Sequence, residues 1–327
     1  MAESVVKRVI LERSSDCALA CCKYLNVGQM AKLFKDKTDC FHLISMEEEK
    51  WDIEIKPKDR MLAIDFKEML RYRDLFIMFV RRDISTAYKQ TVLGPLWWII
   101  NPVLSMVVMV AVFGGIVGIP TDGVPAALFY LLGPAVWSYF SACLTATSNS
   151  FVTNSGIFGK VYFPRMIMPL VSVTTNLVAF GVQMLIFVAF YIYYVATGTP
   201  IAPNWIGLLF PILVVLLALT AAGFGMVVSS MTTKYRDLQI VFTHIVSLWM
   251  YVTPVIYPLS MVENPKLHTL MSLNPITPIV EAVKYGLLGT GDFSWLWLGY
   301  SFVFMVVLLA FGIIVFNKTQ KSFMDTV

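Results

Sequence analysis

Residues 205–230 read WIGLLFPILVVLLALTAAGFGMVVSS, a run in which Asp, Glu, Lys and Arg do not occur. As a helix this run would be about 39 Å long, which exceeds the roughly 30 Å hydrocarbon core of a bilayer. It therefore predicts a transmembrane helix. The whole chain has a matching composition: of 327 residues, 57% are hydrophobic and 14% are charged, and the mean hydropathy is +0.71. A soluble domain would carry about 25% charged residues.

Five other apolar runs are long enough to cross a bilayer. Six spans are therefore predicted, at residues 95–119, 126–147, 166–196, 205–230, 238–257 and 293–316. None of them contains Asp, Glu, Lys or Arg, and His244 is the one histidine within a span. Ion-driven carriers need ionisable groups at membrane depth, and channels use charged rings, so both classes are disfavoured. The predicted fold is an all-α polytopic membrane protein.

Lys and Arg are divided unequally between the two sets of connecting segments. The loops on one side hold two, Lys266 and Lys284. The other side holds many more, and positive charge is enriched on the cytoplasmic side of membrane proteins. We therefore expect a multi-pass protein of the plasma (inner) membrane with both termini in the cytoplasm. The cations on that side are Arg71, Arg73, Arg81, Arg82, Lys89, Lys160, Arg165, Lys234, Arg236, Lys318 and Lys321.

Residues 51–92 lead into the first span and show two patterns. Residues 51–56 (WDIEIK) alternate apolar and polar side chains, which is typical of a short strand. A basic amphipathic helix follows, with Arg71, Arg73, Arg81 and Arg82 among its charged residues. Such a helix beside a span most simply lies in the membrane interface, with its cations near headgroup phosphates. The alternative is a surface helix of a cytoplasmic domain.

Residues 1–50 form an N-terminal extension with weak periodicity. One hypothesis is that translation starts at Met46, which would make residues 1–45 a misassigned extension. The first 20 residues contain no apolar core of a signal peptide, which argues against disulfide bonds. The spacing of Cys17, Cys21 and Cys22 matches no common zinc pattern. We therefore expect reduced thiols and no bound metal.

The segment between the last two predicted spans is punctuated by prolines. Asn264-Pro265 and Thr277-Pro278 each resemble an N-cap followed by proline in the first turn of a helix, and Gly289 ends the second piece. Two helices of about ten residues would each be about 15 Å long, half a bilayer. Residues 263–289 are therefore predicted to form a re-entrant helical hairpin at the outer face. A loop lying flat on that face is the alternative.

Residues 149–165 (NSFVTNSGIFGKVYFPR) form a predicted cytoplasmic loop that mixes apolar side chains, expected to be exposed, with Lys160 and Arg165. This mixture favours docking into a groove of a partner protein. An amphipathic connector resting on lipid is the alternative. The nucleotide-binding motif G-x-x-x-x-G-K-[ST] does not occur, because residues 156–160 (GIFGK) are too short and lack the hydroxyl residue. The chain is therefore not expected to bind ATP by itself.

Aromatic residues make up 14% of the chain and cluster towards the ends of the spans. Interfacial anchoring explains most of them, although flat aromatic faces also stack on sugar rings. A polar residue within a span can join helices or contact a sugar hydroxyl. The side chains considered for a translocation path are Trp97, Trp98, Asn101, Tyr139, Tyr251 and Tyr257.

Several separated motifs, taken in order, resemble those of ABC-2 type permeases. RRD at residues 81–83 is followed by YKQTVLGPLW at 88–97 and NP at 101–102. Further motifs lie at residues 154–169, at 234–238 (KYRDL), at 251–258 and at 273–278 (LNPITP). The chain is similar above all to the branch that exports polysaccharides and polyol phosphates, such as O-antigen, capsule and teichoic acid. The resemblance covers roughly residues 51–318.

This resemblance implies a transport subunit rather than an enzyme. Two copies would form the membrane core from a transmembrane domain at residues 93–318, followed by a cytoplasmic tail at 319–327. Separate ATPase subunits would bind from the cytoplasm and carry ATP and Mg, so no cofactor is expected on this chain and no nucleic acid partner. The substrate would be a lipid-linked polysaccharide, and membrane lipids would surround the spans.

The resemblance also assigns roles to particular residues, and the hairpin would gate the outer mouth. The ATPase-coupling residues would be Ile157, Phe158, Lys160, Tyr162 and Arg165. Those that meet the lipid-linked phosphate would be Arg71, Arg73, Arg81, Arg82, Lys89 and Gly94. The outer gate would contain Asn274, Pro275, Pro278 and Glu281.

Two rival functions stay open on the sequence. A permease of the same superfamily could move drugs or small lipids. A membrane-embedded transferase acting on lipid-linked sugars would need a group of carboxylates or histidines at one membrane face. Glu263, His268, Glu281 and Asp292 all lie on the predicted outer side.

Overall fold

The computed structural model describes residues 66–89, 94–158, 163–199, 201–233, 235 and 237–323. All of these belong to one compact unit, Asp59–Val327. The predicted strand at residues 51–56 and the extension at residues 1–50 lie outside the described residues. Within the described part of the chain every regular element is helical, so the predicted all-α fold is confirmed there.

Five helical segments are long and apolar enough to cross a membrane, which makes the chain a multi-pass membrane protein. They agree with five of the six predicted spans to within a few residues. The first runs through α6 (Trp97–Met109) into a π-helical segment, η2 (Val110–Ile116). The others are α7 (Ala126–Ser148), α9 (Ile167–Ala196), η3 (Trp205–Leu209) with α10 (Phe210–Thr232), and α14 (Trp295–Phe323).

The remaining predicted span is shorter than expected. Helix α11 covers Leu238–Val252, about 22 Å of helix, and the predicted end at residue 257 is wrong. Thr253 has an extended backbone, with ψ 136°. The reason is Pro254, which lacks an N–H and whose ring disfavours a helical conformation of the residue before it. The chain after α11 continues as a turn, in which Val255 and Ile256 are buried.

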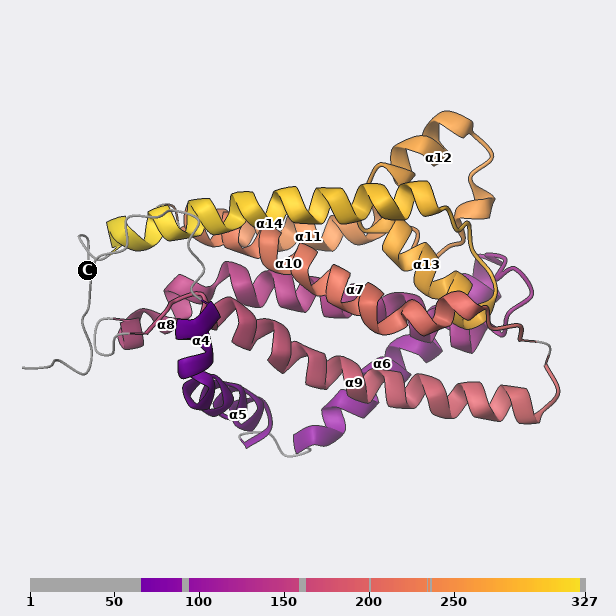
Figure 1. Cartoon of the computed structure of the whole chain (residues 1–327). Coiled ribbons are helices and arrows are strands. Elements are labelled where there is room, and N and C mark those ends of the chain that lie inside the picture. The colour runs from indigo at the N-terminus through magenta and orange to yellow at the C-terminus, as the bar shows by residue number, and fades with distance from the viewer. Residues whose placement is uncertain are drawn as a thin grey trace, which may run out of the picture. The chain divides into compact units, whose positions relative to one another are not determined.

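Helices α7 and α10 form the centre of the bundle. In their apolar windows 72% and 56% of the residues are buried, against 6% in the segment that begins with α6. Small residues allow the two central helices to approach closely. A Cβ atom added to Gly225 on α10 would lie 2.5 Å from Cβ of Thr147 on α7. Helices α9 and α14 pack against this pair (Figure 1).

The predicted hairpin consists of α12 (Pro265–Ser272) and α13 (Thr277–Leu288). The two helices differ in their surroundings. Most of α13 is buried against α7, α10 and α14, as expected for a re-entrant helix that protein covers. Most of α12 is exposed and stands out from the bundle (Figure 1). The predicted pair of helices is therefore present, but only α13 is inserted among other helices, and the alternative of a loop lying flat does not describe α12.

The ends of these two helices test the predicted caps. The side chain of Asn264 accepts a hydrogen bond from the Lys266 N–H at 3.0 Å, so that cap is confirmed. Thr277 is the first helical residue rather than the N-cap, so that assignment is wrong. The Asn274 side chain instead accepts from the Ile276 N–H at 3.3 Å. Gly289 ends α13 with φ +77°, a backbone conformation that glycine adopts readily.

The predicted basic amphipathic helix is also present, as α4 (Phe66–Arg71) and α5 (Arg73–Lys89). Figure 1 shows α5 nearly end-on while the long helices run across the picture, so α5 lies across the bundle. One face of α5 carries Phe79, which is 5% exposed and contacts Phe163 just before α9. This crosswise orientation is the one expected for a helix in the membrane interface.

Candidate functional site

The predicted coupling segment is tied into the chain by aromatic packing. It contains α8 (Ser150–Phe158), while Lys160 and Tyr162 lie outside the described residues. Phe158 is 5% exposed, and its ring lies 6.0 Å from that of Phe151 and 5.7 Å from that of Phe163. The expectation of an exposed Phe158 is therefore wrong. Ile157 is half-buried and packs against the edge of the same cluster.

This aromatic cluster, which lies on the predicted cytoplasmic side and is centred on Phe79, Phe151, Phe158, Phe163 and Phe316, joins three elements. Phe316 on α14 stacks on Phe151 with ring centroids 4.4 Å apart. Phe79 brings in α5. A displacement of α8 would therefore be transmitted by direct contact to α5 and to α14, because a close-packed cluster does not deform freely.

Arg165 is buried at the edge of this cluster rather than free on the surface. Its Nη1 donates a hydrogen bond to the carbonyl of Gln320 on α14 at 3.0 Å. The guanidinium also lies 5.2 Å from the centre of the Phe158 ring, a cation–π arrangement. Burial lowers the pKa of Arg165, because desolvation disfavours the charged form. Its position indicates that it holds the coupling segment against α14.

The predicted phosphate-binding residues fall into two groups. Arg71, Arg73, Arg81 and Lys89 are exposed. Arg82 instead pairs with Asp83 at 2.8 Å, donates to Asn154 Oδ1 on α8 at 3.4 Å, and lies over the Phe79 ring. Arg82 thus links α5 to the coupling segment, and the exposed cations are the ones available to an anionic ligand.

The exposed face of α5 also borders a hollow. A shallow hollow of about 390 Å³ is lined by Asp74, Ile77, Met78 and Arg81. After α5 the chain reaches Gly94, whose φ of +48° is in the left-handed region; residues 90–93 between them lie outside the described residues. Glycine tolerates this conformation without the steric cost of a side chain. Gly94 is the first residue of η1 (Gly94–Leu96), which leads directly into the first span.

The predicted path residues lie in different environments. Asn101 is exposed on α6, Trp97 is 41% exposed and Trp98 is half-buried. Tyr251 at the end of α11 is 63% exposed, and its carbonyl accepts a hydrogen bond from the Tyr257 hydroxyl at 3.1 Å. Tyr139 is 3% exposed and stacks on Phe180 with centroids 4.8 Å apart. In this conformation Tyr139 belongs to the core and not to an accessible surface.

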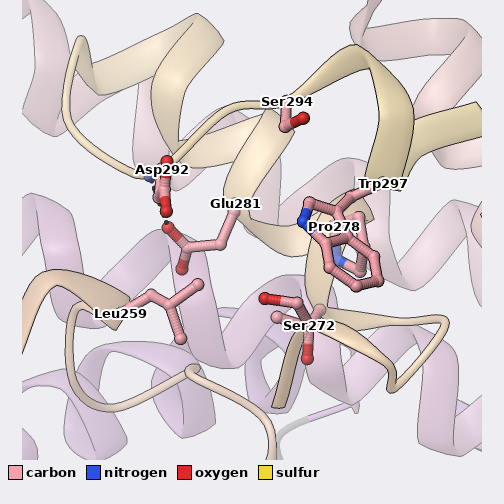
Figure 2. Close-up of a pocket in the computed structure, with 8 residues that line it drawn as sticks. Leu259, Ser272, Pro278, Glu281, Asp292, Ser294 and Trp297 are labelled. Atoms are coloured by element: carbon pink, nitrogen blue, oxygen red, sulfur yellow. Dashed lines mark hydrogen bonds between the residues drawn. The ribbon is translucent and has the colours of Figure 1, made fainter. Parts of the chain in front are cut away.

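The predicted gate residues surround the start of α13. The Asn274 amide donates to Thr253 Oγ1 at 2.9 Å, and Pro275 is buried. Pro278 and Glu281 line a cavity of about 10 Å³ (Figure 2), which is room for about one water molecule. Glu281 is 1% exposed and forms an ion pair with Lys284 at 3.2 Å. Pro278 and Glu281 therefore share one cavity, whereas Asn274 is tied to the end of α11.

Sequence reasoning missed Lys284, which it counted as an ordinary cation of an outer loop. The spacing Glu281-x-x-Lys284 places the two charges on the same side of a helix. Their neighbours Ile279, Val280 and Val283 are apolar. An oppositely charged pair three residues apart within an apolar helix was the available signal for a buried pair.

These features define a class: a polytopic helical membrane protein with an amphipathic helix before its first span, a buried helix before its last span and a packed segment between its second and third spans. A profile of the ABC-2 type transporter family matches residues 74–288. The chain belongs to this family, whose members are membrane subunits of transporters.

The chain is similar to three export permeases over most of its length. It is 28% identical over 219 residues to the O-antigen export system permease protein RfbA of Myxococcus xanthus, which covers 67% of this chain and 82% of that protein. It is 24% and 23% identical over 265 residues to two proteins of the same name from Klebsiella pneumoniae, which covers 81% of this chain and 99% of each of them.

Proposed function

We propose that this chain is the transmembrane subunit of an ATP-driven ABC exporter that moves a lipid-linked polysaccharide, of the O-antigen class, across the plasma membrane. The observation that carries the proposal is the family match over residues 74–288, together with relatives that are named O-antigen export permeases. A separate ATPase subunit supplies the energy, two copies of this chain form the membrane core, and both termini are cytoplasmic.

The cytoplasmic aromatic cluster supports a specific route of coupling within this function. An ATPase subunit that binds at residues 157–165 pushes on α8. Through Phe158 and Arg165 this displacement reaches α14, and through Arg82 and Phe79 it reaches α5. ATP binding or hydrolysis then shifts an equilibrium between closed and open arrangements of the two copies, by the difference in its interaction energy with each.

The exposed cations of α4 and α5 support the recognition of an anionic lipid carrier. Arginine pairs with phosphate through several directed hydrogen bonds, and lysine adds a compact charge. Arg71, Arg73, Arg81 and Lys89 are exposed on an interfacial helix, where headgroup phosphates lie. The phosphate of a lipid-linked glycan binds there before it enters a path lined by Trp97, Asn101 and Tyr251.

The transferase alternative is not favoured by the outer carboxylates. The Glu281 carboxylate is buried, pairs with Lys284 and accepts the Asp292 N–H at 3.1 Å. It is thus engaged on both oxygens and out of contact with a substrate. Asp292 is paired with His268 at 2.9 Å. Because these carboxylates are already paired with other groups of the protein, the arrangement resembles a structural network rather than an open acid–base site.

Deletion and complementation test the proposed function. Deleting the gene should leave glycan attached to its lipid carrier inside the cell, and supplying this chain together with its ATPase subunit should restore glycan at the surface. An ATPase subunit with an inactivated nucleotide site is the matched control and should not restore it. Normal surface glycan in the deletion strain, with altered drug or small-lipid efflux instead, would favour the rival permease function.

A further inference from the structure

Lys284 is a fully buried cation at the outer end of an otherwise apolar bundle. Its side chain is 2% exposed and that of Glu281 is 1% exposed, on a helix that packs against three others. A charge in such surroundings is strongly disfavoured unless it is paired and hydrogen-bonded. The contacts of the ammonium group therefore show what it holds in place.

The ammonium group of Lys284 lies in a cage of three oxygen atoms and one aromatic ring. Nζ donates to the carbonyl of Pro254, to the carbonyl of Tyr257 at 3.4 Å and to Glu281 Oε1 at 3.2 Å. It also lies 4.6 Å from the centre of the Phe129 ring on α7. A lysine ammonium has three donors, and here each finds an acceptor. Carbonyl oxygens and carboxylates are groups that bind cations in proteins, and here they bind the side-chain ammonium of Lys284.

Two of those acceptors belong to the turn at residues 253–258, where α11 ends. The same turn is held by the Asn274 amide on Thr253 and lies directly against α7, where a Cβ on Gly133 would be 2.4 Å from the Val255 carbonyl. Along α11 itself Val246 is the one buried residue. Trp249, near the end of α11, packs against aromatic rings of α7 and α10, so these contacts and the turn together position this end of the helix.

Glu281 connects the cage to a third segment. Its Oε2 accepts the backbone N–H of Asp292 at 3.1 Å, in the loop that leads to α14. Gly291 in that loop has φ +129°, and a Cβ there would lie 2.9 Å from Oε2. The loop can approach the carboxylate this closely because the residue is glycine. The Glu281–Lys284 pair thus joins the end of α11, the inserted helix α13 and the approach to α14. Figure 2 shows the Glu281 side chain beside Asp292.

We propose that Lys284, held by Glu281, is a positioning residue of export: its ammonium fixes the turn at residues 253–258 and thereby sets the orientation of the exposed face of α11 that carries Tyr251. This inference rests on the proposed function, since Tyr251 is a proposed lining residue of the path. In this proposal the buried Glu281–Lys284 pair on α13 controls the orientation of α11, although α13 and α11 share no long packing surface.

The test separates positioning from mere charge balance. The double variant Glu281→Gln with Lys284→Met removes both charges, so it leaves no unpaired charge in the interior, but it loses the cage. Glu281→Asp keeps both charges and shortens the carboxylate arm. His268→Gln with Asp292→Asn is the matched control, because it removes a half-exposed pair from the same region and leaves every group of the cage in place, since Glu281 accepts the backbone N–H of Asp292 and not its side chain.

Each variant is assayed for export and for the accessibility of α11. Accessibility is the rate at which a water-soluble thiol reagent labels Tyr251→Cys in membranes, in a chain whose natural cysteines are replaced by serine. Phe302→Cys on α14, which is also exposed, reports on general unfolding. Coupling between packed elements typically changes equilibria by about 5–150-fold, so the double variant should change the labelling rate at Tyr251→Cys by about tenfold, with Phe302→Cys unchanged and export lost.

Wild-type labelling at Tyr251→Cys and wild-type export in the double variant would overturn the inference, since charge balance alone would then suffice. If the double variant fails to accumulate, Glu281→Asp decides by the same two measurements. Labelling requires neither ATP nor glycan, so it tests positioning independently. A parent chain that does not export glycan refutes the proposed function and leaves the labelling result standing.

Discussion

The contact between Gly207 and Gly286 seats α13 against η3, at the start of the fourth span. A Cβ atom added to Gly286 would lie 2.8 Å from the backbone nitrogen of Gly207 and 2.9 Å from its Cα. Non-bonded carbon contacts are normally about 3.5–4.0 Å, so Gly286→Ala must separate the two backbones by roughly 0.6–1.2 Å. The obstacle is backbone on both sides, which cannot rotate away as a side chain would.

The expected cost follows from this separation. Overpacking of this kind costs about 1–3 kcal/mol. The separation also strains two hydrogen bonds that Asn204 donates, to the carbonyl of Gly286 at 3.1 Å and to that of Tyr285 at 3.2 Å. The two are worth about 2 kcal/mol together in net terms, and losing half of that adds about 1 kcal/mol. Alanine is favoured over glycine in a helix by about 1 kcal/mol. The net destabilisation is therefore about 1–3 kcal/mol.

Thermal stability in detergent measures this cost. The fraction of chain that stays monodisperse after heating should fall at a temperature several degrees below that of the parent protein. Gly181→Ala on α9 is the matched control, because no atom lies within 4 Å of the added Cβ, and it should be neutral or slightly stabilising. If Gly286→Ala melts at the parent temperature, α13 is not seated by this contact and the reasoning fails.

Three further predictions concern the predicted cytoplasmic end. Phe158→Asp puts a charge into the aromatic cluster, so co-purification with the ATPase subunit and ATP turnover should fall; unchanged values would contradict the coupling route. Lys89→Ala should reduce surface glycan while assembly stays intact, because Lys89 is exposed; normal glycan would exclude it from phosphate binding. Arg82→Ala should lower thermal stability by about 1 kcal/mol, because Arg82 links α5 to Asn154; an export defect at full stability would show that Arg82 instead binds the lipid-linked phosphate.

Local chemistry allowed much of the fold to be predicted. Uninterrupted apolar runs reveal spans because lipid forbids unpaired charge and unpaired backbone alike. The cap at Asn264 and the end of α13 at Gly289 follow from residues whose backbone preferences are local. The end of α11 was also visible in Pro254, but hydropathy alone extended that span to residue 257.

The candidate site was less accessible from the sequence. Phe158 and Arg165 stand in a short polar-flanked segment, where an exposed docking surface and a packed connector have the same composition. Their burial depends on Phe79 and on Phe316, which are distant in the chain. Arg82 likewise lies in a basic stretch that is typical of phosphate binding. Its contact with Asn154 could not be predicted from that stretch, because Asn154 lies 72 residues away.

The sequence by itself determined the helical membrane fold, the predicted sidedness and the family motifs, because these depend on transfer free energies and charges that each segment carries alone. Only the tertiary structure decided which polar groups are free and which are engaged. Lys284 illustrates the difference. From the sequence, a cation in a short helix predicted on the outer side is expected to be solvated. In the structure its charge is buried, because Pro254, Tyr257, Glu281 and Phe129 converge on it from three segments.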